Sequence, residues 1–206
     1  MGVMTKTFEQ VRAVFSKRAV NMTDIQLLHY ANNMVREDIK DDYYTTFEQD
    51  AAATQEITVV AGQYAYPLPD DFFDVFVPRN MKSPVTDENN LTIQKSYADQ
   101  YREQNFGFGG RVFWIDSENI NFPKESIDKA VIKEGEKIYL NYLKQIPEVE
   151  DESEELPFGS RLQDKLFPVY VAGIQYFFFT DGKKIVDRSL QLSNYNTSKA
   201  NAFSIV

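Results

Sequence analysis

The spacing of apolar residues changes twice along this chain, and the two changes limit the folds that it can adopt. From Thr23 to about Lys40, apolar residues recur every three or four positions, as in an amphipathic helix, and this spacing returns after Ser160. Between these segments, residues 56–143 hold short β-branched and aromatic runs separated by Gly and Pro, which is typical of strands and turns. The sequence therefore predicts an α+β fold, in which a helical bundle from the chain ends carries a small antiparallel β-rich insert at about residues 56–143.

The first long helix has a clear start. Thr23 and Gln26 have the spacing of a capping box, in which each side chain bonds the backbone N–H of the other residue. The helix is expected to run to about Lys40. The residues expected on its buried face are Ile25, Leu28, Val35 and Ile39, with Leu27, Ala31 and Met34 beside them.

A second long helix is expected after Ser160, with Pro168 as a kink or break and Asp181-Gly182 as its end. A last helix is expected to start with the segment Lys184–Leu192. Residues 193–206 are mostly polar, which indicates a C-terminal arm outside the fold. The chain is thus expected to be a single domain, residues 1–206, with an N-terminal extension (1–22), a helical part (23–55 and 157–192), the β-rich insert (56–143) and the arm (193–206).

Glycine turns divide the β-rich insert. Gly62 is expected to close a hairpin within residues 56–66, because Gly readily adopts the positive φ of a tight turn. Gly135 is expected to close a second hairpin within residues 130–143. The other elements expected here are strands at Phe72–Val77, Leu91–Ile93 and Arg111–Ile115 and a short helix at Ser96–Gln104.

Composition limits the chemistry of the chain. Thirty-one acidic residues against 22 basic ones give a formal net charge of −9, which argues against free DNA or RNA as a partner because Lys and Arg supply phosphate affinity. There is no Cys, and His29 is the only histidine, which excludes disulfides, thiol nucleophiles and multi-histidine metal sites. Apolar runs are too short to span a bilayer, and the N-terminus lacks a signal-peptide core. We therefore expect a soluble protein, made in the cytoplasm, without a cofactor or metal.

The candidate catalytic features are weak. His29 lies within a predicted helix with no nucleophile in local reach, which favours a structural or partly exposed histidine. The run Gly107–Gly110 lacks the Lys-Ser/Thr of a phosphate loop. Asp70 and Asp181 match a metal-dependent nuclease pattern only loosely, and the acidic run Glu148–Glu155 lacks calcium-loop spacing and is expected to be an exposed loop. The chain is therefore predicted not to be an enzyme.

Aromatic residues occupy all sides of the second long helix. The run Tyr176–Phe179 is consecutive, so one side of the helix is expected to be buried by another chain. The chain also ends in alternating apolar residues, a pattern suited to strand addition on a partner. The candidate partner interface comprises Tyr176, Phe178, Phe179, Phe203, Ile205 and Val206.

Several motifs follow one another in a characteristic order. A capped helix precedes a hairpin motif of the form Thr-x-x-x-Gly-x-x-x-Tyr-x-Leu-Pro-x-Asp-Phe, which is followed by the turn at Gly135. Leu156-Pro157 then leads into the aromatic helix. The residues of the hairpin motif are Thr58, Gly62, Tyr66, Leu68, Pro69, Asp71 and Phe72. Over about residues 23–192, this order resembles that of the head–tail connector, or adaptor, proteins of tailed bacteriophages.

The resemblance implies a structural virion protein. Connector proteins form a ring, usually of twelve copies, that joins the capsid portal to the tail and lets DNA pass. The implied partners are the portal protein, a tail or second neck-ring protein and further copies of the chain, with DNA only as passing cargo and no membrane. The implied location is the virion neck, where negative charge around the channel would keep DNA from adhering.

A second class of function stays open. The Tyr-rich β block would also suit a non-catalytic binding module of a tail or baseplate, which holds a partner protein or a glycan. Ring formation on a portal distinguishes the connector from this alternative.

Overall fold

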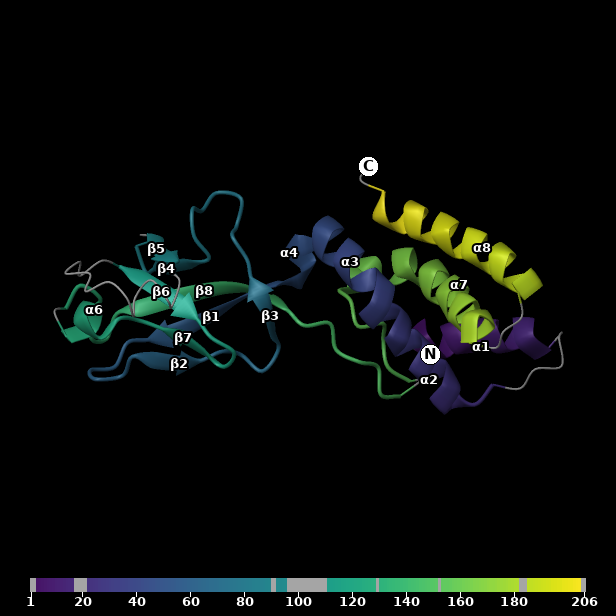
Figure 1. The fold of residues 1–206 in the computed structure, drawn as a ribbon, viewed down its shortest axis with the longest axis horizontal. Coiled ribbons are helices and arrows are strands. Elements are labelled where there is room, and N and C mark those ends of the chain that lie inside the picture. Colours follow the sequence, from purple (N-terminus) through teal and green to yellow (C-terminus); the bar gives the residue numbers. More distant parts are fainter. Residues whose placement is uncertain are drawn as a thin grey trace. The chain divides into compact units, whose positions relative to one another are not determined.

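The computed structural model describes residues 3–16, 22–89, 92–95, 111–128, 130–151, 153–181 and 185–204. The chain divides into two compact units, one made of Met1–Ala51 and Ile146–Val206 and the other of Ala52–Gln145. We call the first the helical unit and the second the strand-rich unit (Figure 1). The predicted α+β class is confirmed, and the strand-rich unit lies close to the predicted bounds of the insert, residues 56–143.

Helix α7 is the central element of the helical unit, because α1, α2 and α8 each contact it. A helix with three neighbouring helices buries most of its circumference, which explains why α7 is apolar on all sides. Pro168 lies inside α7, which continues through it without a break. The elements of this unit are α1 (Val3–Ser16), α2 (Asp24–Met34), the π-helical turn η1 (Val35–Ile39), α3 (Lys40–Thr46), α4 (Glu48–Ala51), the 3-10 turn η2 (Ser160–Leu162), α7 (Gln163–Asp181) and α8 (Ile185–Phe203).

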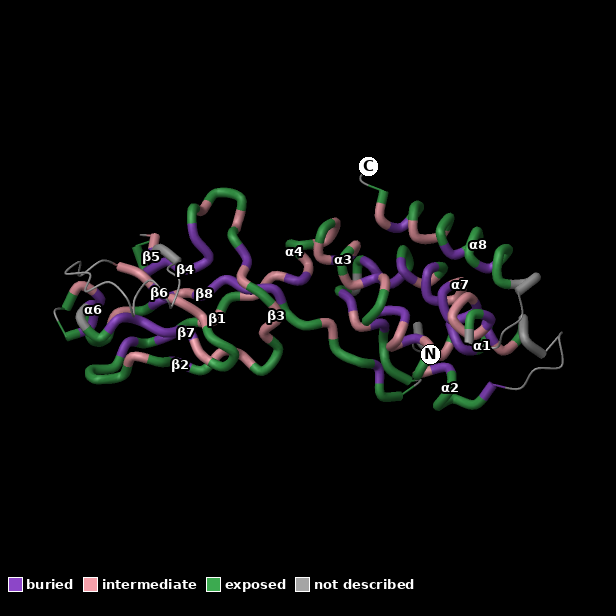
Figure 2. Tube along the Cα trace, in the orientation of Figure 1, coloured by how far each residue is buried: buried purple, intermediate pink, exposed green. Residues whose placement is uncertain are grey.

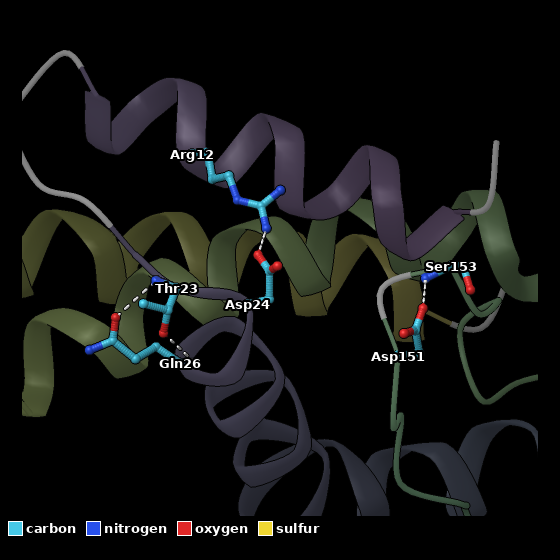
Figure 3. A network of polar contacts seen from close by, with 6 residues as sticks. All are labelled: Arg12, Thr23, Asp24, Gln26, Asp151 and Ser153. Atoms are coloured by element: carbon cyan, nitrogen blue, oxygen red, sulfur yellow. Dashed lines mark hydrogen bonds and ion pairs between the residues drawn. The ribbon is translucent and has the colours of Figure 1, made fainter.

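The start of α2 is as predicted. The Thr23 hydroxyl accepts a hydrogen bond from the Gln26 N–H at 3.3 Å, and the Gln26 side-chain oxygen accepts one from the Thr23 N–H at 3.0 Å (Figure 3). Asp24, in the first turn, forms an ion pair with Arg12 of α1. These contacts satisfy backbone donors that a helix start leaves without partners and tie α2 to α1.

The rest of α2 differs from the prediction. Its buried residues are Leu27, Ala31 and Met34, whereas Ile25 is 80% exposed. Ala31 and Met34 follow Leu27 by four and seven residues, so all three lie on the side of the helix that contacts α7. Ile25 lies on a different side. The helical course also continues beyond the expected end near Lys40, through η1 and α3.

Both chain ends belong to the helical unit, so the predicted extension and arm are wrong for their described residues. Helix α1 contacts α7, and α8 continues to Phe203 instead of ending near Leu192. The polar sequence of α8 is a weak helix former, but Tyr195 and Ala202 are buried within the unit. Tertiary packing here outweighs the intrinsic helix propensity.

Two side-chain amides hold the chain where it enters α7. Asn32 donates to the Val149 carbonyl and accepts from the Val149 N–H, both at 2.9 Å. The Gln163 amide donates to the carbonyls of Leu156 and Phe158 at 2.9 and 2.8 Å and accepts from the Leu156 N–H at 3.1 Å. This entry segment is therefore fixed by side-chain hydrogen bonds, long-range from Asn32 and local from Gln163, rather than by regular secondary structure.

In the strand-rich unit, the strand order is β1-β8-β4-β5-β6-β7-β2, and β3 also pairs with β8. The pair β5–β6 is parallel, which departs from the predicted all-antiparallel insert; the other described pairs are antiparallel. The elements are β1 (Ala52–Thr58), β2 (Ala65–Pro67), β3 (Phe72–Val75), β4 (Val85–Asp87), β5 (Thr92–Lys95), β6 (Val112–Ile115), β7 (Asn119–Asn121), the short helix α6 (Lys124–Asp128) and β8 (Lys137–Lys144).

Neither predicted hairpin forms. Gly62 and Gly135 adopt the expected positive φ, 73° and 79°, but β1 pairs with β8 and β2 pairs with β7. Residues 130–133 form no strand. Strand β8 pairs with β1 along one edge. Along its other edge, β8 pairs with β4 in its first half and with β3 in its second half. The turn signals set the local backbone direction without setting the strand partners.

The sheet curls around its core. The side-chain amide of Gln55 in β1 donates to the Pro67 carbonyl in β2 at 3.1 Å, so the first and last strands of the order approach each other. The predicted helix Ser96–Gln104 lies outside the described residues. The core residues are Ile57, Val59, Tyr66, Val85, Ile93, Phe113, Ile120, Phe122, Ile127, Ile132, Ile138 and Leu140.

Candidate partner interface

The aromatic residues expected to meet a partner pack mainly within the helical unit. The Tyr176 ring stacks on Tyr195 of α8 with 5.6 Å between centroids, and Phe178 meets Tyr30 of α2 edge-on at 5.9 Å. Phe179 is only 2% exposed. Helices of the same chain therefore cover much of this surface, while Tyr176 and Phe178 stay half-buried.

The C-terminal residues of the predicted interface do not extend this surface. Phe203, at the end of α8, is half-buried with its ring 5.6 Å from that of Phe47. Ile205 and Val206 lie outside the described residues. The four described members of the predicted interface therefore pair with internal aromatic residues instead of forming one exposed patch.

Exposed apolar side chains occur instead on α8. Leu190 is 56% exposed and Leu192 is 37% exposed. A shallow, open groove of about 550 Å³ follows the outer side of the same helix. This surface was not expected from the sequence, because residues 193–206 were interpreted as an arm. A helical projection of the segment would have shown the surface. The groove is lined by Ser189, Leu192, Ser193, Asn196, Thr197 and Ala200.

The loop before η2 exposes negative charge, as predicted. Val149 is its buried anchor, bonded to Asn32. Hydrogen bonds from the Ser153 side chain and N–H lower the pKa of Asp151, so this carboxylate keeps its charge (Figure 3). The exposed acidic residues described here are Glu148, Glu150, Asp151, Glu154 and Glu155.

A second charged cluster lies in the strand-rich unit. One nitrogen of the Arg111 guanidinium lies 3.0 Å from an Asp87 carboxylate oxygen and also pairs with Glu136. The Asp87 side chain is 3% exposed, and its other oxygen accepts from the Asn89 N–H at 2.8 Å. Glu136 accepts from the Lys133 N–H at 2.9 Å. Because these bonds tie β4 to the turn before β8, the cluster has a clear structural role beside a groove of about 390 Å³.

The described candidate catalytic residues, His29 and Asp70, lie on the surface. His29 is exposed, and its Nε2 lies 3.0 Å from the Asn33 amide nitrogen. Asp70 is exposed on the loop before β3. The Gly107–Gly110 run and the Asp181 side chain lie outside the described residues. Over the ranges that the structure describes, no group of three or more His, Asp or Glu side chains could hold a metal ion.

Comparison with models of known protein families gives no match, and comparison with curated proteins gives none either. Among the helices that the structure describes, none has the length and apolar character needed to cross a membrane.

Proposed function

We propose that this chain is a head–tail connector of a tailed bacteriophage, a non-enzymatic virion protein whose copies form a ring between the capsid portal and the tail. The observation that carries the proposal is the division of the chain: one helical unit is assembled from both chain ends, and the strand-rich unit is inserted between them. The connector resemblance implies this organisation. In the proposal, α1, α2, α7 and α8 are the bundle of each subunit.

Charge supports a role around passing DNA. Acidic residues outnumber basic residues in both units, and each copy adds a formal charge of −9. A ring of such copies repels the DNA phosphates, so DNA moves through without adhering to the wall. The connector therefore acts by joining surfaces, with DNA only as cargo.

The surface proposed for contact between copies is the exposed part of α8, whose two large apolar side chains flank its buried side. Leu190 and Leu192 are large apolar side chains exposed on this helix. Identical head-to-tail contacts close into a ring when their rotation allows it. We expect the free chain to be a monomer or weakly associated, with the ring forming on the portal, which presents the template.

The test is to mix the purified full chain with the portal protein encoded in the same genome. Native mass spectrometry and electron microscopy should show a closed ring of copies on the portal. The double variant Leu190→Asp with Leu192→Asp should assemble poorly. As a matched control, Val60→Asp changes a 48% exposed residue of the strand-rich unit and should assemble normally.

Failure to bind the portal at every salt concentration would remove the connector proposal. Binding to a tail or baseplate component without portal binding would favour the alternative binding module. Circular dichroism of each variant separates an assembly defect from a folding defect.

A further inference from the structure

The buried side of α8 includes several polar residues. Its buried and half-buried residues recur at helical spacing, while Leu190 and Leu192 are exposed. Figure 2 shows buried, half-buried and exposed positions following one another along α8. An amphipathic helix ordinarily turns leucines toward its neighbours and polar residues outward. Among the described side chains of α8, the buried and half-buried ones are Gln191, Tyr195, Ser198, Lys199, Ala202 and Phe203.

Part of this polar surface is buried without compensation. The side-chain oxygen of Gln191 has no hydrogen-bond partner, and the residue is 4% exposed. The hydroxyl of Tyr170, on α7 near Tyr195, is likewise buried without a partner. When α8 leaves α7, water can bond both atoms, so these groups favour the open state.

One lysine opposes this tendency. Lys199 Nζ lies 2.8 Å from an Asp38 carboxylate oxygen in η1 and 2.7 Å from an Asp42 oxygen in α3. The Lys199 side chain is 17% exposed, and its ammonium lies 5.7 Å from the centre of the Tyr195 ring. Burial alone would lower the pKa of Lys199, but the two carboxylates outweigh it and raise the pKa. The contact thus joins α8 to two other helical segments through charge.

We propose that Lys199, Asp38 and Asp42 form a latch that holds α8 closed on α7, and that α8 opens as a unit when the latch is broken while α1, α2 and α7 stay folded. Helix α8 packs on α7 and also contacts α3. In the closed state, Tyr195 also contacts Tyr176, and Phe203 contacts Phe47. Opening uncovers the side of α7 around Tyr170 and Gly173, independently of the ring proposed above.

Native-state hydrogen exchange of the full chain, read by mass spectrometry, tests the latch. In Lys199→Met, peptides from α8 should exchange roughly tenfold faster, while peptides from α2 keep their protection. Arg161→Met removes a matched ion pair with Asp50 in which the arginine side chain is 79% exposed, and it should leave α8 exchange unchanged. Equal acceleration in α2 and α8, or no acceleration in α8, would overturn the proposal.

Two further variants keep the test decisive if Lys199→Met folds poorly. Asp42→Asn leaves the Asp38 contact in place and should accelerate α8 exchange to a smaller extent. Gln191→Leu replaces the uncompensated amide with an apolar side chain and should slow α8 exchange severalfold below that of the natural sequence. Faster α8 exchange in Gln191→Leu would show that the polar side does not favour opening.

Discussion

Gly173 of α7 lies so close to Met34 of α2 that a β-carbon at position 173 would clash with the Met34 sulfur. The same β-carbon would lie 2.9 Å from Cε2 of Tyr195 on α8. Met34 is fully buried and Tyr195 is 1% exposed, so neither side chain can move aside into solvent without leaving the core. The missing side chain at position 173 is therefore what lets α2 and α8 both pack closely on α7.

Gly173→Ala should destabilise the helical unit by about 1–3 kcal/mol, because the added methyl group overpacks the contact. Urea unfolding followed by circular dichroism measures the change. Gly159→Ala is the matched control, since its β-carbon would meet nothing within 4 Å, and it should change stability by less than about 0.5 kcal/mol. Equal stability of the two variants would contradict the close packing at position 173.

Asn32→Ala should cost about 1–3 kcal/mol and loosen the acidic loop, because the Val149 backbone loses both of its 2.9 Å hydrogen bonds to the Asn32 amide. Unfolding measurements give the cost, and limited proteolysis after acidic residues of the loop reports the loosening. Asn33→Ala removes a neighbouring amide whose contact is with the exposed His29, so it should alter neither measurement. Unchanged proteolysis of Asn32→Ala would show that the anchor lies elsewhere.

Arg111→Met should destabilise the strand-rich unit by about 1–3 kcal/mol, because it leaves the buried Asp87 and the half-buried Glu136 carboxylates without their shared cation. Adding Asp87→Asn to Arg111→Met should recover part of this loss, since one uncompensated charge is removed. Lys137→Met breaks the exposed pair with Glu56 and serves as the control, with no measurable change expected. A mild effect of Arg111→Met would mean that water reaches the two acids.

Alkaline pH should destabilise the helical unit. Burial, followed by the charge of Asp50 and by Tyr44, raises the pKa of Tyr43 from 10.0 to about 12, and burial with nearby Asp38 raises the pKa of Tyr195. The folded state thus keeps phenol protons that the unfolded chain releases, so stability is intact below about pH 10 and falls as the pH rises toward about 12. Urea unfolding at a series of pH values measures the fall. Tyr43→Phe should make it shallower, whereas an unchanged slope would assign the effect to other groups.

Local signals in the sequence were sufficient where structure depends on near neighbours. The Thr23–Gln26 capping box forms as predicted, because both partners lie within one helical turn. Gly62 and Gly135 adopt positive φ, because this conformation costs glycine no side-chain clash. The exposed acidic loop follows from self-repulsion among neighbouring charges.

Predictions that required a partner for each element were less successful. The sequence contains no local signal that β1 pairs with β8, since the partners Ala52 and Leu143 are far apart in the chain. The aromatic residues of α7 suggested a second chain because apolar periodicity shows that a surface is buried without showing what covers it. Tyr195 and Tyr30 of the same chain proved to be neighbours of this surface.

The sequence by itself determined the α+β class, the start of α2, the two glycine turns and the acidic surface, because each depends on composition or on contacts within a few residues. The tertiary structure alone decided the strand order, the orientation of α2 and the helical course of residues 193–203. These features depend on which distant segment covers an apolar surface. Helix α8, for example, packs on α7, and its residues Tyr195 and Ala202 are buried. Burial against a distant segment outweighs local propensity, and local sequence patterns do not reveal which distant segment that is.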